Sequence, residues 1–486
     1  MAGNRAIAHP ESQRLAGGAL TTRDAVVISV SILAPGMAML LNVPGVAVVA
    51  GGSTPLAFLL GGIACLALAF VVVGFTRRMA SAGYAYTYAS RSLGKSAGFL
   101  AGWLYAFGVT CFVPMTMAAV AYLTADLLGL GGAWWFPLFL VGMVLLVGLS
   151  IVRIKVTTRL QMVLGVVTVA VIVIVDIVVT VRGGAHGNTL APFTFSHTQQ
   201  GGVSGVFYGI ILGITSYIGF ETAADFGEET SNPRRAIPIA IVASVVFAIV
   251  LYLWTTYSLS IGFGVENGAA FGGDSFALKT IADRFVGGTL GTLVEIGALL
   301  SAFVVCVGCA TAATRTLYAM GRERVLWAWL SRTHPRFRTP ANATVAVALV
   351  STVLAAVVGF GLASPNLGSS PAMTVYYLFA TLGTLAVIVV YIGLCVGGAV
   401  YFRRVHPRYR VGAHLVVPAV GVLLFAAALF GSIYPTPPAP LAAAPYVVLA
   451  WLVVGIATVV VLHARRPDAI ARIGSILGED TAAELT

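Results

Sequence analysis

Long apolar runs separated by short polar segments dominate the chain. Each run has about 20 residues or more, which as a helix is long enough to cross a hydrocarbon core of about 30 Å. The pattern predicts an all-α integral membrane protein with twelve transmembrane helices. We expect these spans at Ala25–Val49, Pro55–Phe75, Ser96–Leu128, Trp134–Ile151, Thr158–Val181, Gly202–Phe226, Ile237–Phe263, Thr292–Met320, Ala341–Phe360, Pro371–Phe402, Ala413–Tyr434 and Pro445–His463.

The polar segments divide the chain further. We predict an amino-terminal tail at 1–24, a core of ten spans at 25–402, two additional spans within 403–464 and a carboxy-terminal tail at 465–486. The stretch Phe271–Phe285 is too polar to cross a membrane, and we expect a loop with a short surface helix there. We predict no cleavable signal peptide, because the first apolar run is longer than the apolar part of such a peptide.

The basic residues in the loops predict an orientation. The chain has 28 Lys and Arg residues, and this span assignment puts all but three of them on one face. The exceptions are Arg182, Lys279 and Arg284. Loops rich in Lys and Arg stay in the cytoplasm. We therefore expect an even number of spans in the cell membrane, with both tails cytoplasmic.

Composition supports this class and argues against others. The chain is 59% hydrophobic and only 9% charged, which is typical of a polytopic membrane protein. Its net charge of +11 is dispersed through short loops, so we expect no nucleic-acid partner. All five cysteines lie in apolar runs, where buried packing is the simplest role. No metalloenzyme or phosphate-loop motif is present, and we predict no metal, no cofactor and no enzymatic activity.

Two predicted spans are interrupted in the membrane. The first contains Leu33-Ala34-Pro35-Gly36-Met37-Ala38, and the sixth contains Ile218-Gly219-Phe220-Glu221. Each is the first of a set of five spans, and the second set is inverted because five is odd. Interrupted helices at matching places in two halves indicate an inverted-repeat transporter with its site near the midplane. We therefore predict a 5+5 repeat, about 25–181 and 202–402, with helices 1 and 6 broken.

Three motifs carry a resemblance to a known family. They are Tyr217-Ile218-Gly219-Phe220-Glu221 with Asn232-Pro233-Arg234-Arg235 and Ile237-Pro238, Gly83–Tyr88 with Gly98–Tyr105, and Arg315–Glu323. The chain resembles bacterial amino acid permeases of the amino acid–polyamine–organocation (APC) superfamily. This resemblance implies a leucine-transporter-like fold and a secondary active transporter that moves amino acids or related amines by alternating access, as a proton-linked symporter or an exchanger. The expected partners are the bilayer, a small-molecule amino acid or amine and, as an option, a second copy in a homodimer.

Three alternatives remain open at this point. The first is a polyamine or amine exchanger with the same fold. The others are a sensor that has lost transport and a channel, although the sequence has no filter repeat or pore ring.

The resemblance also implies a set of substrate-binding residues. Free N–H and C=O groups at a helix break suit the carboxylate and the ammonium of an amino acid. The family's Gly-(Ser/Thr)-Gly step for the carboxylate aligns with Gly36-Met37-Ala38, which lacks the hydroxyl and the second glycine. The carbonyls of Ala34, Thr215 and Ile218 match the ammonium positions. Gly219 marks the second break.

Several further residues are expected near the substrate. Phe220 follows the break, and its alternatives are to line the pocket or to pack beside it. Val109 in span three and Ala310 in span eight are expected to face the substrate side chain. This lining is mostly uncharged, which favours a neutral or mildly polar substrate.

Two acids are candidates for gating or proton coupling. Glu221 and Asp225 are four residues apart and share a face of a regular helix. Ionised carboxylates are costly at membrane depth, which makes them functional candidates. The alternative is a structural hydrogen bond that holds the broken helix. Some family members carry a coupling lysine in span five, where Thr168 aligns. We expect the remaining acids of the spans, Asp126, Asp176 and Glu295, near the outer interface and solvated.

Overall fold

The computed structural model describes most of the chain. The described residues are 21–79, 84–152, 158–199, 202–226, 230–322, 326–334, 336–337, 339–368, 370–405, 409–434 and 436–465. Apart from residues 21–24 and Arg465, the two predicted tails lie outside this part.

Helices account for nearly all of the described structure. Within it, 11 helical stretches are long and apolar enough to cross a membrane. The principal helices are α1 (Thr22–Ile32), α2 (Pro35–Met37), α3 (Val43–Ala50), α4 (Thr54–Thr76), α6 (Lys95–Leu127), α7 (Trp135–Val152), α8 (Thr158–Arg182), α9 (Val203–Tyr217), α10 (Pro233–Phe263), α13 (Gly288–Arg322), α14 (Ala341–Gly361), α15 (Pro371–Val405), α16 (Val417–Gly431) and α17 (Ala444–Arg465).

Most predicted spans agree with these helices to within a few residues. The first helical stretch, Thr22–Thr76, has 55 residues and contains both predicted spans Ala25–Val49 and Pro55–Phe75. The count of twelve therefore remains a prediction, as does the 5+5 repeat. The seventh span begins earlier than predicted, because α10 starts at Pro233. Proline suits the first helical turn, since its fixed φ matches the helix and its missing N–H needs no acceptor there.

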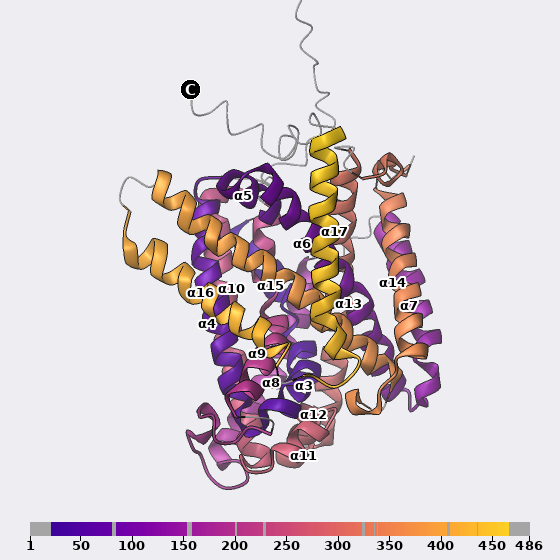
Figure 1. Ribbon diagram of the computed structural model, residues 1–486. Coiled ribbons are helices and arrows are strands. Elements are labelled where there is room, and N and C mark those ends of the chain that lie inside the picture. Colours follow the sequence, from indigo (N-terminus) through magenta and orange to yellow (C-terminus); the bar gives the residue numbers. More distant parts are fainter. Residues whose placement is uncertain are drawn as a thin grey trace, which may run out of the picture.

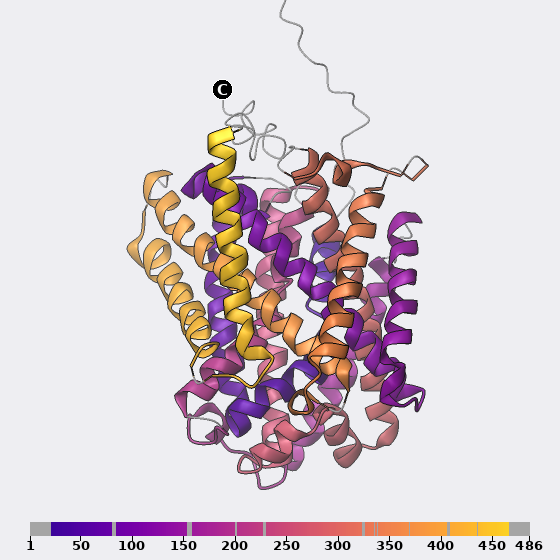
Figure 2. The ribbon, with the colours of Figure 1, turned by 45° about the vertical axis from the view of Figure 1, so that its right-hand side comes forward.

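The long helices run side by side between two ends of the molecule (Figures 1 and 2). The short helix α5 (Tyr84–Leu93) lies at the end of the molecule where α17 ends. The short helices α11 (Gly268–Gly273) and α12 (Ala277–Phe285) lie at the opposite end. The stretch Phe271–Phe285, predicted to be too polar to span, contains α12 and the end of α11, so it holds parts of two short helices rather than one.

The three basic residues predicted to share one face gather at the α11–α12 end. Arg182, at the end of α8, donates to the carbonyl of Phe285 at 2.7 Å. Arg284 donates to the carbonyl of Gly262 at 3.3 Å, and Lys279 lies in the same helix α12. Their grouping agrees with the alternation of basic loops on which the orientation was predicted.

Helices at the outer surface of the bundle expose large apolar side chains. On α7 and α14, which lie side by side at one edge of the bundle, large apolar residues such as Val144 and Val357 are exposed. In water such surfaces would be unfavourable, whereas in a bilayer they contact lipid. The broken segments α1 to α3 and the helix α9 are buried against α4, α8, α10 and α13.

Candidate functional site

The first predicted break is present between α1 and α2. Ala34 has left-handed backbone angles, φ 49° and ψ 58°, and Pro35 has no N–H to continue the helix. The next helical hydrogen bond joins the amide of Ala38 to the carbonyl of Ala34 at 2.9 Å. The amides of Gly36 and Met37 therefore lie in the first turn of a new helix, where no helical acceptor exists.

The second predicted break follows α9. Ile218 leaves the helical region with ψ 131°, and Gly219 has φ 117°, a value that glycine adopts without strain. A 3₁₀ helix, η6 (Phe220–Phe226), continues the chain. Because α9 ends here, its last carbonyls point beyond the helix without helical donors.

The two breaks lie against each other. A β-carbon added at Gly219 would be 2.8 Å from Ile32 Cγ2 and 3.2 Å from the Ile32 carbonyl carbon. The backbone of the second break thus packs on the end of α1. A β-carbon added at Gly36 would be 2.6 Å from Thr168 Cγ2. Thr168, which aligns with the family's lysine position, therefore faces the first break.

Glu221 joins the second break to a neighbouring helix. Its Oε2 accepts a hydrogen bond from the Gly219 amide at 3.0 Å, and its Oε1 accepts one from the Tyr391 hydroxyl of α15 at 2.5 Å. The side chain is buried. Both carboxylate oxygens therefore have donors, and one of those donors is the backbone of the break itself. Asp225 lies in η6, but its side chain is outside the described part of the chain.

A polar network of residues that were not predicted from the sequence surrounds the segment of the first break. Asn42 donates to Ser216 Oγ at 2.9 Å and accepts from the Tyr376 hydroxyl at 2.7 Å. The Tyr377 hydroxyl donates to the carbonyl of Leu41 at 2.9 Å. The Tyr252 hydroxyl donates to the carbonyl of Leu33 at 3.0 Å. The available signal was a set of polar side chains within apolar runs, because each such group needs a partner at membrane depth.

The remaining predicted site residues are buried, with Ile218 half-buried. Thr215 shares a hydrogen bond of 2.6 Å with the hydroxyl of Thr384 on α15. Phe220 is completely buried, and its carbonyl accepts from Ser244 at 3.4 Å. Ala34, Met37 and Ala38 are also buried.

Val109 and Ala310 lie on the interface between α6 and α13. Cys306 Sγ of α13 is 3.7 Å from the carbonyl of Val113 in α6. Residues four apart share a helix face, so Val109 and Ala310 extend this contact by one turn on each helix. Both are buried, whereas the side of α13 that meets Ile32 is occupied by Gly308.

The expectation that the other acids are solvated is wrong for two of them. Asp176 and Glu295 are completely buried, and each carboxylate has one hydrogen-bonded oxygen. Thr255 donates to Asp176 at 2.7 Å, and Lys279 donates to Glu295 at 2.5 Å. Asp126 is partly exposed and lies 3.3 Å from the same lysine. The helix α12, predicted to be a surface element, thus supplies a counter-ion to the buried Glu295 of α13.

Comparison with known proteins decides the family. Residues 20–459 match the family model described as "Amino acid permease". The chain belongs to this family. As expected, its members are transporters and not enzymes.

Relatives of this permease carry chemically different substrates. It is 26% identical over 396 residues to the methylthioribose transporter of Bacillus subtilis (strain 168), which covers 77% of this chain and 79% of that protein. It is 26% identical to the branched-chain amino acid permease BcaP of Lactococcus lactis subsp. cremoris (strain MG1363), over 75% of this chain and 80% of that one. It is 28% identical to the low-affinity putrescine importer PlaP of Escherichia coli (strain K12), over 62% and 66%. Identity to these relatives therefore does not select a substrate for this permease.

Proposed function

We propose that this permease is a secondary active transporter that moves an amino acid with a neutral side chain, or a closely related amine, across the cell membrane. The observation that carries the proposal is the contact between the two backbone breaks at Ile32 and Gly219. The ten residues proposed to bind substrate supplement it, because none of them has an ionisable side chain.

In this proposal, backbone N–H and C=O groups at the breaks provide partial charges that complement the carboxylate and the ammonium of an amino acid. We assign the substrate carboxylate to the amides of Gly36 and Met37, at the positive end of a helix segment. The ammonium is assigned to carbonyls at the end of α9, at Thr215 and Ile218, together with Ala34. The carbonyl of Ala34 already accepts from Ala38, but a carbonyl oxygen has a second lone pair.

Alternating access is assigned to movement at the breaks. In this proposal the core of ten spans carries the inverted repeat, spans eleven and twelve lie outside it, and both tails are cytoplasmic. Glu221 acts as a gating residue by bracing the second break, since its carboxylate ties Gly219 to Tyr391. Proton coupling through Glu221 or Asp225 is the competing assignment.

A polyamine exchanger is the second candidate function. It is favoured by the similarity to the putrescine importer. A diamine brings a second ammonium that would be buried, and such a charge needs a carboxylate partner. The uncharged set of predicted binding residues therefore favours a neutral amino acid over a diamine.

Counterflow in proteoliposomes tests the proposal. Vesicles are loaded in turn with leucine, serine, lysine, putrescine or methylthioribose, and uptake of the same labelled compound is measured. We expect accelerated uptake with a neutral amino acid and none with lysine. Counterflow with putrescine alone would support the amine exchanger. Thermal stabilisation by an amino acid without counterflow would indicate a sensor, and ion flux without substrate would indicate a channel.

A further inference from the structure

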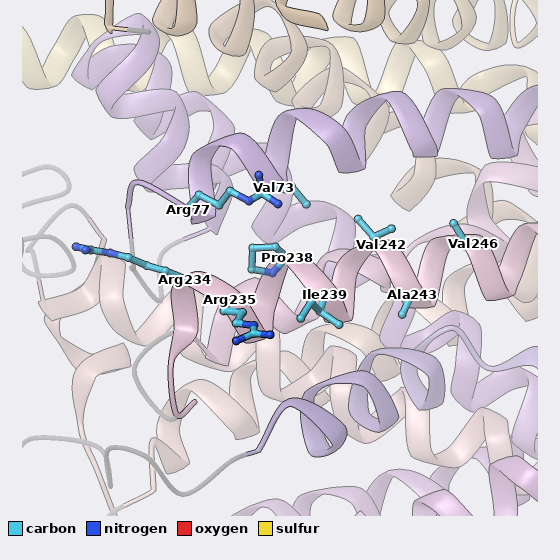
Figure 3. A pocket seen from close by; sticks show the side chains of 9 residues that line it. All are labelled: Val73, Arg77, Arg234, Arg235, Pro238, Ile239, Val242, Ala243 and Val246. Carbon is cyan, nitrogen blue, oxygen red and sulfur yellow. The ribbon is translucent and has the colours of Figure 1, made fainter. Parts of the chain in front are cut away.

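A groove opens between the end of α4 and the beginning of α10, away from the breaks (Figure 3). Its volume is about 670 Å³. Arg77 lies at the end of α4, and Arg234 and Arg235 lie in the first turn of α10. All three arginines are exposed. Below them the groove is lined by Val73, Pro238, Ile239, Val242, Ala243 and Val246.

The groove has two chemically distinct parts in a fixed order. Figure 3 shows Arg77 on α4 across from Pro238 on α10, with Val242 and Val246 following along α10. The apolar part faces away from the interior of the helix bundle, because the side chains of Ile239, Val242 and Val246 remain 45%, 43% and 44% exposed. In the membrane, such a wall is in contact with an acyl chain.

The positions of the arginines and of the apolar residues along the two helices correspond to headgroup and acyl-chain depth in a membrane. Arg77 is the C-cap residue of α4, and Arg235 is in the first turn of α10, so both stand where a span ends. From Pro238 to Val246 the helix rises by about 12 Å at 1.5 Å per residue. This length fits within one leaflet of the hydrocarbon core, which is about 15 Å deep as half of 30 Å. The arginines therefore lie at headgroup depth and the apolar wall at acyl-chain depth.

We propose that this groove binds an anionic phospholipid. Its phosphate is held by Arg77, Arg235 adds positive charge at the same headgroup depth, and one acyl chain lies along Val242, Ala243 and Val246. Guanidinium groups are strong donors to phosphate oxygens, and basic pockets between membrane helices bind anionic headgroups. The charge of the rim selects an anionic lipid over a zwitterionic one, and the apolar wall selects a lipid over a free anion.

Lipid-dependent thermal stability of the purified full-length protein tests this site. The probes are dioctanoyl phosphatidylglycerol, dioctanoyl phosphatidylcholine with the same chains, and glycerol phosphate without chains. Each is titrated at constant ionic strength and constant detergent. We expect half-maximal stabilisation by the phosphatidylglycerol at a lower concentration than by the phosphatidylcholine, and none by glycerol phosphate.

Charge variants assign the effect to the groove. The double variant R77A/R235A should raise the half-maximal phosphatidylglycerol concentration by about fivefold for each arginine removed. The matched control is R403A/R404A, which removes two exposed arginines from the end of α15 and should leave that concentration unchanged. A second variant, Ala243→Trp, fills the apolar part without changing charge and should weaken the response as well. The single variants R77A and R235A provide the same test if the double variant does not fold.

Five results would overturn the proposal, and the first four concern the lipid response alone. They are equal responses to the two lipids, an equal loss in R77A/R235A and R403A/R404A, an unchanged response in Ala243→Trp, and stabilisation by glycerol phosphate at the lipid's concentration. The fourth result would identify a site for a soluble anion. The fifth is dissociation of a dimer into monomers in R77A/R235A with an unchanged lipid response, which would identify the groove as an interface between two copies.

Discussion

Glu221 gives the sharpest test of how the break in span six is held. Replacement by alanine removes the acceptor of the buried Gly219 amide and the partner of the Tyr391 hydroxyl. An unsatisfied buried donor costs about 1–3 kcal/mol, so two of them cost roughly 2–6 kcal/mol. This is a large part of the 5–15 kcal/mol by which proteins are typically stable. We therefore expect E221A to unfold at a clearly lower temperature and to lose uptake.

Two conservative variants separate the hydrogen bonds from the charge. In E221Q the amide oxygen can accept from Gly219 while its NH₂ donates to Tyr391, so both bonds persist. The loss is then about 2 kcal/mol, since a bond to a charged group exceeds one to a neutral group by about 1 kcal/mol and Glu221 makes two such bonds. Y391F removes one bond and leaves the Gly219 contact in place. We expect stability to fall in the order wild type, E221Q, Y391F, E221A.

Thermal unfolding in detergent and uptake into proteoliposomes between pH 5 and 8 provide the measurements. If Glu221 is a brace, the pH profile of E221Q overlays that of the wild type. A flattened profile would show that Glu221 titrates during transport. Stability of E221Q as low as that of E221A would show that the charge itself is required, and the hydrogen-bond argument would be wrong.

Three other predictions concern the glycine of the second break, the ion pair of α12 with α13, and the orientation in the membrane. G219A should lose uptake, because φ 117° and the 2.8 Å approach to Ile32 leave no place for a methyl group, whereas G213A, with 3.5 Å to its nearest neighbour, should retain it. K279A should destabilise by about 3–5 kcal/mol, since it leaves the buried Glu295 carboxylate without its partner, and K279A/E295Q should recover much of that loss in thermal unfolding. Partial burial lowers the pKa of Lys279, but the hydrogen bonds and charges of Glu295 and Asp126 outweigh this effect and raise it. The stability that the ammonium contributes is then present below about pH 10.4 and is lost as the pH rises through the raised pKa, so the advantage of the wild type over K279A/E295Q should fall as the pH rises above about 10.4. A cysteine at exposed Asn188 should react with an impermeant thiol reagent from outside the cell and one at exposed Arg332 should not, and the reverse pattern would overturn the proposed orientation.

The sequence by itself determined the class of protein and the places where helices fail. Apolar runs of membrane-spanning length have few alternatives to helices, because every backbone group must be paired inside the bilayer. Pro35 and Gly219 mark breaks for local reasons, a missing N–H and a positive φ, and such reasons are visible in a sequence. The family motif around the second break was also visible, because its residues are close together in the sequence.

Tertiary structure decided which groups meet. Asn42, Tyr376 and Ser216 are far apart in the chain, and only packing puts them within hydrogen-bond distance. The same holds for Glu221 and Tyr391, 170 residues apart. Helix phase is weakly specified in a span that is apolar all round, so a sequence cannot say which face meets which neighbour. Burial of Glu295 depended on Lys279 from another element, and for that reason the sequence alone led to the wrong expectation of a solvated acid.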